Sequence, residues 1–267
     1  TALLITKASL RSRVHRRVFM DMVSVKRFDA NGNVCGEFRI VGLFTSTAYT
    51  RSTRSIPYLR KKVDALLKRA RFHPSGHSGK ALVNALETYP RDDLFRIDDD
   101  LLYEFAMLIL ELDERPRVRV LARRDRFDRF MSVLVYLPRA RSSNDVVEAV
   151  GELLCKSYKG HVSGLSLFFP EGPLMRAHYI IGRSAEPIDD PQRSTLEDGV
   201  SAIVRTWVDA LDDEIARTQE AGRARQLFER YRKAFSASFR DRYSPETALD
   251  NIRTIEGLSA ERPLSVD

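Results

Sequence analysis

The spacing of apolar residues between positions 116 and 183 constrains the fold more than any other feature of this sequence. Alternation with a period of two indicates a strand, and a period near 3.6 indicates a helix. In chain order, the segments are the strands 118–122 and 131–137, the helix 146–158, and the strands 162–169 and 177–182. This order, with another helix next, predicts four antiparallel strands with helices on one face. We therefore expect an α+β sandwich of the ferredoxin-like kind, a ββαββ unit in permuted connectivity.

A hairpin is expected at the beginning of the chain. Alternating apolar positions in 18–28 end at a polar turn, and the strand pattern resumes from 34 to 48. Asn31-Gly32 supplies the positive φ that a tight turn requires. Because a lone hairpin is marginally stable in water, we expect further strands upstream of Thr1 to complete its sheet. The apolar run Leu3–Ile5 fits an excised fragment that starts inside a folded element.

Three helices are expected between residues 56 and 115. The first begins at Ile56-Pro57 and ends before Pro74, and the second takes Ser78 as its N-cap and stops at Pro90. The third begins behind the acidic run 98–100, whose carboxylates favour the positive end of a helix.

The last part of the chain is expected to be helical. The apolar stripe from Leu196 to Ile215 predicts one helix, a second carries Leu227 and Phe235, and a last one begins at Ser244-Pro245 and stops at Gly257. The expected modules are a β-hairpin in 1–50, a three-helix segment in 51–115, the α+β domain in 116–188, a helical motif in 189–257 and a linker in 258–267.

The charge balance favours a soluble, ionic surface. Lys and Arg outnumber Asp and Glu by 44 to 37, which gives a net charge of +7, and most of the cations are arginines suited to carboxylate and phosphate contacts. The longest apolar run, 105–110, is far shorter than the roughly 20 residues that cross a bilayer. With two cysteines, Cys35 and Cys155, far apart in sequence, we expect a reducing cytoplasm and no membrane.

Residues 76–80 contain glycine, lysine and a helix start, as a phosphate-binding loop does. Pro74 stands where the first glycine should be, and Ala81 stands where a magnesium-binding Ser or Thr should be. We interpret the segment as a helix-start turn, with nucleotide binding as the alternative.

The residues that could form a metal or catalytic site lack a local signature. His73 and His77 have helical spacing, but Pro74 and Gly76 interrupt a helix there and no third ligand is evident, so a metal site remains an alternative to loop histidines. Neither cysteine has a neighbouring His and acid in sequence. No glycine fingerprint for a dinucleotide lies between a strand and a helix. We predict no catalytic residue, no metal and no cofactor in this chain.

Two basic clusters flank the hairpin. Their members are candidates for interdomain or anion contacts: Arg11, Arg13, Arg16, Arg17, Arg51, Arg54, Arg60, Lys61 and Lys62. Aromatic residues lie between them in the sequence, as in nucleic-acid-binding surfaces. An arginine-rich surface that faces an acidic domain of a larger protein is the other interpretation.

Several long segments of the sequence resemble segments of the large bacterial NAD-specific glutamate dehydrogenases. They are residues 42–49, 56–63, 77–82, 86–95 and 114–119. The resemblance covers residues 3–140 closely and the later residues more loosely.

The resemblance implies an amino-terminal region built of ACT-like, PAS-type and helical modules, placed before a catalytic region that binds NAD and glutamate. The hairpin would end a PAS- or ACT-like module, 116–183 would be an ACT-like domain, and residues 189–257 would begin a helical motif. None of the family's catalytic or nucleotide-binding motifs is visible in this chain. The expected function is therefore a non-catalytic regulatory and oligomerisation region, with other domains and subunits of the parent enzyme as partners and an amino acid as effector. Nucleic-acid binding through the arginine clusters is the alternative.

Overall fold

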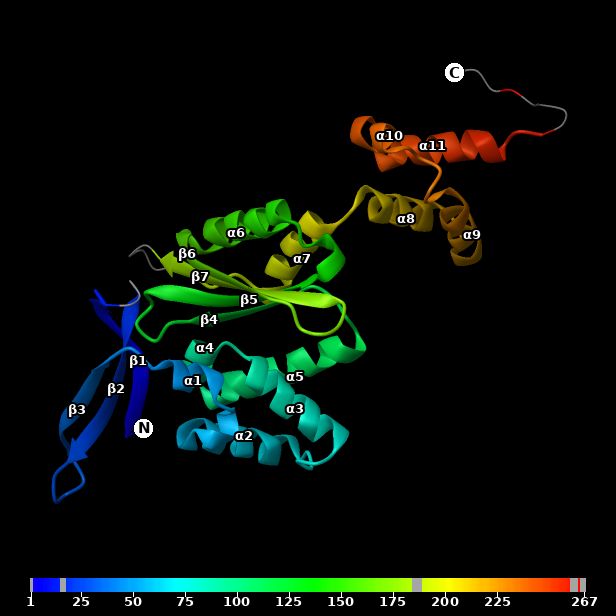
Figure 1. The fold of residues 1–267 in the computed structure, drawn as a ribbon. Coiled ribbons are helices and arrows are strands. Elements are labelled where there is room, and N and C mark those ends of the chain that lie inside the picture. The colour runs from blue at the N-terminus through cyan, green and yellow to red at the C-terminus, as the bar shows by residue number, and fades with distance from the viewer. Residues whose placement is uncertain (1, 15–17, 184–188, 260–263, 265–267) are drawn as a thin grey trace. The chain divides into compact units, whose positions relative to one another are not determined.

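The computed structural model describes residues 2–14, 18–183, 189–259 and 264 of the 267-residue chain. The chain forms two compact units, residues 1–200 and 201–267, which are described one at a time. Figure 1 labels the helices and strands of both units. In the described part of the chain, no helix is long and apolar enough to cross a membrane.

The first unit begins with an antiparallel sheet of strand order β1-β2-β3. Its strands are β1 (Leu3–Arg11), β2 (Phe19–Phe28) and β3 (Val34–Gly42). The hairpin prediction is confirmed for β2 and β3, and Gly32 in the turn has a φ of 82°. Asp29 shapes this turn, because its Oδ1 accepts hydrogen bonds from the backbone N–H groups of Asn31 and Asn33 at 2.9 and 2.8 Å.

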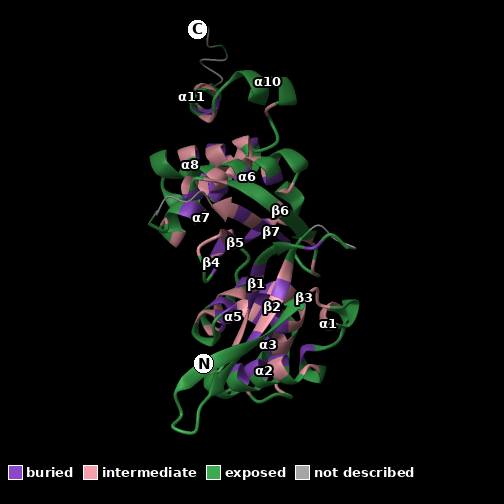
Figure 2. Cartoon of the chain, turned by 90° about the vertical axis from the view of Figure 1, so that its left-hand side faces the viewer, coloured by how far each residue is buried: buried purple, intermediate pink, exposed green. Residues whose placement is uncertain are grey.

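Two details of this sheet differ from the prediction. The second hairpin strand ends at Gly42 instead of Ala48, and residues 46–50 form the short helix α1 (Ser46–Thr50). The chain also supplies a third strand, β1, which pairs with β2 so that Leu3 lies opposite Val25. Most of β3 is exposed, and Figure 2 shows it in green beside the partly buried β2.

A helical segment follows the sheet. It contains the 3₁₀ helix η1 (Thr53–Ser55) and the helices α2 (Pro57–Ala70), α3 (His77–Thr88), α4 (Arg91–Arg96) and α5 (Asp99–Glu114). Proline opens α2, as predicted. The acidic run 98–100 lies at the start of α5, as predicted, but the helix already begins at Asp99, and the side chain of Asp98 caps it by accepting from the N–H of Asp100.

Two predictions for this segment were wrong. The structure has a fourth helix, α4, because the six residues after Pro90 turn once more before α5 begins. Ser78 is not a cap: α3 starts at His77 behind Gly76, and no side chain caps it. A Cβ atom at Gly79 would lie 2.1 Å from the carbonyl oxygen of His73, so close packing of the preceding loop explains this glycine.

A four-stranded antiparallel sheet, of order β4-β5-β7-β6, forms the second half of the unit. Its elements are β4 (Arg119–Arg124), β5 (Phe130–Pro138), the 3₁₀ helix η2 (Arg139–Arg141), α6 (Asn144–Tyr158), β6 (Gly160–Phe168), β7 (Leu174–Arg183) and α7 (Arg193–Val204). The predicted ββαββ order and the helix after it are confirmed.

Both faces of this sheet are covered, whereas the sequence predicted helices on one. Between this face and the helices α6 and α7 lie side chains that are at most 1% exposed, from the sheet (Val133, Val135, Ala177 and Tyr179) and from α6 (Val150 and Leu154). On the opposite face Leu121, Leu134 and Tyr136 belong to one core with the side chains of α2, α3, α4 and α5. The strand β5 is buried on both faces for this reason, in agreement with its unbroken apolar run 133–137, which departs from strict alternation.

The second unit is a small helical bundle. Its helices are α8 (Trp207–Thr218), α9 (Ala221–Tyr231), α10 (Ala237–Arg242) and α11 (Pro245–Glu256). The prediction of a single helix for 196–215 is wrong, because α7 ends at Val204 and α8 begins at Trp207. Thr206 caps α8: its N–H donates to Asp209 Oδ2 at 2.8 Å, and its hydroxyl accepts from the N–H of Asp209. The predicted Ser244-Pro245 start and Gly257 end of α11 are confirmed.

Candidate functional site

The most concentrated group of buried charged residues lies where the helical segment meets the four-stranded sheet. The short helix α4 directs Asp93 at the sheet, and this side chain is 1% exposed. The face that it meets carries Arg123 on β4, Ser132 on β5 and His178 on β7. Arg123 and Ser132 are cross-strand partners, and the partner of His178 is Leu134, two residues along β5. Strand pleating therefore brings the three polar side chains to one face.

Asp93 is the centre of this group, which we call the Asp93 junction. The Arg123 guanidinium donates to Asp93 Oδ1 with an Nη2–Oδ1 distance of 2.5 Å. The Ser132 hydroxyl donates to Oδ2 of the same carboxylate. Arg96 adds a second cation, with its Nη2 3.8 Å from Oδ1. Every acceptor oxygen of the buried carboxylate thus has a partner, as a charge out of water requires.

His178 completes the Asp93 junction through the serine. Its Nε2 lies 2.7 Å from Ser132 Oγ and 3.8 Å from Asp93 Oδ2. Because Ser132 gives its one hydroxyl proton to Asp93, the hydrogen bond to His178 requires a proton on Nε2. The imidazole therefore acts as a donor to the serine oxygen.

Burial and charge set the ionisation of the junction. Burial alone would raise the pKa of Asp93, but Arg123, His178 and Arg96 outweigh it and hold that pKa well below the usual 3.8. Burial lowers the pKa of His178, against the attraction of Asp93, and Arg176 and Arg123 lower it further. The junction at neutral pH is a buried carboxylate and guanidinium beside a neutral imidazole.

The Asp93 junction contains the three residue types of a serine hydrolase triad, but its hydrogen bonds join them in a different order. A triad needs the acid on the histidine and the histidine on an accessible serine. Here Ser132 contacts both Asp93 and His178, and it is 1% exposed. No substrate carbonyl could reach its hydroxyl, so the junction serves packing and not nucleophilic catalysis.

Further polar contacts next to the Asp93 junction hold α4 and the end of α3 in place. Arg176 on β7 donates to the carbonyl of Thr88 at 2.8 Å, at the end of α3. Asp92, the residue before Asp93, accepts from the hydroxyl of Tyr49 at 2.9 Å and lies 3.7 Å from Lys7 Nζ on β1. Consecutive residues of α4 thereby contact both sheets of the unit.

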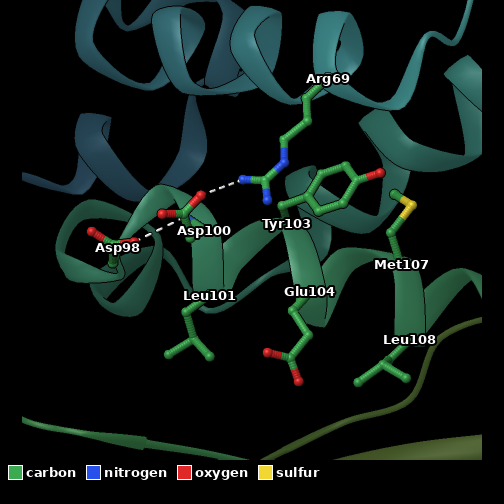
Figure 3. A pocket seen from close by; sticks show the side chains of 8 residues that line it. All are labelled: Arg69, Asp98, Asp100, Leu101, Tyr103, Glu104, Met107 and Leu108. Atoms are coloured by element: carbon green, nitrogen blue, oxygen red, sulfur yellow. Dashed lines mark hydrogen bonds and ion pairs between the residues drawn. The ribbon is translucent and has the colours of Figure 1, made fainter.

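An open hollow of about 650 Å³ lies along α5 (Figure 3). Its polar groups are engaged with one another: Arg69 pairs with Asp100 at 2.5 Å and stacks on the Tyr103 ring at 4.2 Å, and Glu104 pairs with Arg193. The side chains of Leu101, Met107 and Leu108 supply its apolar part. No set of convergent polar groups remains for a reaction.

The residues singled out as candidate contacts are distributed over several elements. Arg11 ends β1 with its guanidinium 4.6 Å from the centre of the Phe19 ring, while Arg16 and Arg17 lie outside the described residues. Exposed members are Arg13, Arg51, Arg54, Arg60 and Lys61. Lys62 is 6% exposed and donates to the carbonyl oxygens of Leu94 and Ile97, so it joins α2 to the end of α4. Their use as interdomain or anion contacts stays a prediction.

The other candidates form no site among the described residues. No group of three or more His, Cys, Asp or Glu there could hold a metal ion. His73 Nδ1 accepts from the N–H of Ser75 at 3.3 Å within its loop. Cys35 is exposed on β3, and Cys155 is partly buried on α6. Sequence reasoning missed Asp93 and its partners, for which the one available signal was an acid beside an apolar pair, Leu94 and Phe95.

The fold defines a class: an α+β region in which, in chain order, a four-stranded α+β domain stands between two helical segments. Three glutamate dehydrogenase family models match the chain. They are helical motif 1 over residues 56–115, the ACT2 domain over 119–208 and helical motif 2 over 214–258. The chain belongs to the family of NAD-specific glutamate dehydrogenases, which confirms the resemblance found in its sequence.

Three curated proteins named NAD-specific glutamate dehydrogenase are similar to this chain. The NAD-specific glutamate dehydrogenase of Halomonas elongata is 36% identical over 97% of this chain, and that of Pseudomonas aeruginosa is 33% identical over 97%. The enzyme of Mycobacterium tuberculosis is 26% identical over 96%. In each case the match spans 16% of the relative's own length.

Proposed function

We propose that this chain is a non-catalytic regulatory and oligomerisation region of an NAD-specific glutamate dehydrogenase. The parent enzyme would convert L-glutamate to 2-oxoglutarate and ammonia with NAD as the oxidant, and NAD would bind outside these residues. The observation that carries the proposal is the match over 97% of the chain to enzymes of which it spans 16%. The remaining length of those enzymes has room for the catalytic machinery.

The Asp93 junction supports a mechanical role. Helix α4 holds the four-stranded sheet through Asp93 and the first sheet through Asp92. A displacement of the helical segment would expose a buried carboxylate and a buried guanidinium without their partners, which costs several kcal/mol. The helical segment and the sheet would therefore move together as a rigid body. A ligand that binds one conformation of this body more tightly can shift its conformational equilibrium.

The module assignment belongs to the same proposal. Residues 1–50 would end a PAS- or ACT-like module, 51–115 and 189–257 would be helical motifs, 116–188 would be the ACT-like domain, and 258–267 a linker. An amino acid would be the effector, neighbouring domains and subunits the partners, and the cytoplasm the compartment. Among the residues that the structure describes, no contact favours nucleic acid, and the most buried of the clustered cations, Lys62, already donates to two backbone carbonyls.

The test compares the isolated chain with the parent enzyme. Glutamate-dependent NAD reduction is expected to be absent from residues 1–267 alone. In the parent, Asp93→Asn is expected to change subunit assembly or the response to amino acids, measured by light scattering and by initial rates across amino-acid concentrations. The exposed Asp198→Asn is the matched control. Turnover by the isolated chain, or a parent enzyme indifferent to Asp93→Asn in both readouts, would refute the proposal.

A further inference from the structure

Three buried arginines at the Asp93 junction share one buried carboxylate. The side chains of Arg96 and Arg123 are each 7% exposed, and Arg176 is also 7% exposed. Arg96 and Arg123 both pair with Asp93, whereas Arg176 forms no ion pair among the residues that the structure describes. A single negative charge therefore faces three positive ones.

The other partners of these arginines do not supply the missing charge. Arg176 Nη1 donates to the carbonyl of Thr88, which is a neutral group. His178 brings no negative charge in either protonation state. Asp125 attracts Arg123, but its carboxylate is already bound by Arg129 at 2.8 Å. The junction thus buries an excess of positive charge, which is unfavourable away from water.

Three buried hydrogen-bond donors at the junction have no partner among the described residues. They are Tyr89 Oη, Arg123 Nε and Arg176 Nε. Tyr89 is 3% exposed and follows Thr88, which Arg176 holds. Burial raises the pKa of Tyr89 well above 10, and the charges of Asp93, Arg123 and Arg176 all act on it, so the hydroxyl keeps its proton beside both guanidiniums.

The remaining groups of the two guanidiniums are already used. Arg123 Nη2 donates to Asp93 and its Nη1 to the carbonyl of Arg124, which leaves Nε as its free donor. Buried donors without acceptors carry a penalty that an acceptor in the same place removes. A water molecule would accept these bonds but bring no charge, whereas an anion does both.

We propose that the first unit binds one small inorganic anion, of the size of chloride, between Tyr89, Arg123 and Arg176. The anion accepts hydrogen bonds from the Tyr89 hydroxyl and from the two Nε–H groups, and it compensates the buried positive charge. Because the three residues are at most 7% exposed, the site is closed to an organic anion and admits a monatomic one. Its role is to complete the packing of α3 and α4 on the sheet.

This inference goes beyond the proposed function and does not depend on it. Anion binding is measured by the stability of the first unit, whereas the proposed function is tested by the parent enzyme's kinetics and assembly. A chain indifferent to chloride would overturn the anion site and leave the regulatory role of the Asp93 junction to its own test.

The first experiment compares thermal unfolding of residues 1–267 in sodium chloride and in sodium gluconate, each at roughly 0.2 M so that screening is equal. Gluconate is too large for a closed site. The circular-dichroism midpoint is expected to be at least about 2 °C higher in chloride, which corresponds to an unfolding constant at least about 5-fold smaller. The fluorescence transition of Trp207, in the second unit, should be the same in both salts. Equal circular-dichroism midpoints, or an equal gain in the Trp207 transition, overturn the proposal.

Tyr89→Phe removes one of the three donors and keeps the ring. It should lose most of the chloride-dependent shift, and in gluconate it should be at least as stable as the unaltered chain, because it no longer buries an unpartnered hydroxyl. Tyr103→Phe is the matched control, since Tyr103 is a partly buried tyrosine of α5 whose ring contacts Arg69. It should keep the full shift. A full shift in Tyr89→Phe, or the same loss in both variants, overturns the site.

Bromide locates the ion if Tyr89→Phe folds poorly. Crystals of residues 1–267 grown in sodium bromide are expected to show an anomalous-scattering peak within hydrogen-bond distance of Tyr89 Oη and Arg176 Nε. Peaks confined to the surface would mean an adventitious ion only and would overturn the proposal.

Discussion

Asp92 and Asp93 are adjacent on α4, and each is held by a different sheet. Asp92 Oδ1 lies 3.7 Å from Lys7 Nζ on β1, and Asp93 Oδ1 lies 2.5 Å from Arg123 Nη2 on β4. Successive side chains on a helix diverge by about 100°, which lets one short turn contact two surfaces. The Asp92 contact is partly exposed, whereas the Asp93 contact is buried, so the second is the stronger determinant of stability.

Removing the charge of Asp93 should destabilise the first unit. Asp93→Asn leaves the Arg123 guanidinium buried without a counter-ion, and breaking a buried pair costs about 3–5 kcal/mol. Urea unfolding followed by circular dichroism should report this loss as a lower midpoint. The exposed Asp198→Asn should change the free energy of unfolding by no more than about 0.5 kcal/mol.

The sole tryptophan makes this prediction specific to one unit. Trp207 lies in the second unit, packed 5.4 Å from the Phe235 ring, and the two units have separate cores. We expect the fluorescence transition of Trp207 to be unchanged in Asp93→Asn. A variant with an unaltered circular-dichroism midpoint, or one in which both transitions shift equally, would contradict the assignment.

Acid should weaken the first unit in two stages. Folding lowers the pKa of His178. Below the unfolded value of 6.5 the unfolded chain therefore binds more protons than the folded chain, and the free energy of unfolding decreases as the pH is lowered. The pKa of Asp93 is also lowered, so its contribution is complete above 3.8 and is lost as pH falls below that value. Both groups therefore act in the same direction.

His178→Gln separates the two stages. Glutamine can still donate to Ser132, but it does not titrate, so the variant should lose less stability than the unaltered chain between pH 6.5 and pH 4.5. Urea midpoints measured at half-unit pH steps would show the difference. Parallel pH profiles for the two chains would mean that His178 does not contribute.

The sequence predicted those features whose physics is local. The Asn31-Gly32 turn, the acidic start of the helix at 98–100 and the ββαββ order each depend on residues close together in the chain, and each is confirmed. The helix α4 could not be predicted, because six residues are too few for a 3.6 period to appear. The partners of Asp93 were hidden for another reason, since Arg123 and Ser132 lie 30 and 39 residues away and only the folded sheet aligns them.

Glu87 should hold the turn before α2. Its carboxylate accepts from the N–H and the hydroxyl of Thr53, both at 2.8 Å, and from the hydroxyl of Ser52 at 2.6 Å. Since Thr53 is fully buried, Glu87→Ala would leave its N–H without a partner, at a cost of about 1–3 kcal/mol. Hydrogen exchange of residues 52–55 should accelerate in Glu87→Ala and much less in Glu87→Gln, which keeps one acceptor oxygen. Equal exchange in both variants would show that the carboxylate does not order the turn.

Two glycine-to-alanine variants should move stability in opposite directions. At Gly79 a methyl group would meet the backbone oxygen of His73 at 2.1 Å, and because a backbone atom cannot swing aside, we expect a loss of at least about 1–3 kcal/mol. At Gly222, in α9, nothing lies within 4 Å, so alanine should gain up to about 1 kcal/mol by restricting the unfolded chain. Circular dichroism should report the loss in the first unit and Trp207 fluorescence the gain in the second. A Gly79→Ala variant as stable as the unaltered chain would mean that the loop at His73 can withdraw, and that the close approach is not what requires glycine there.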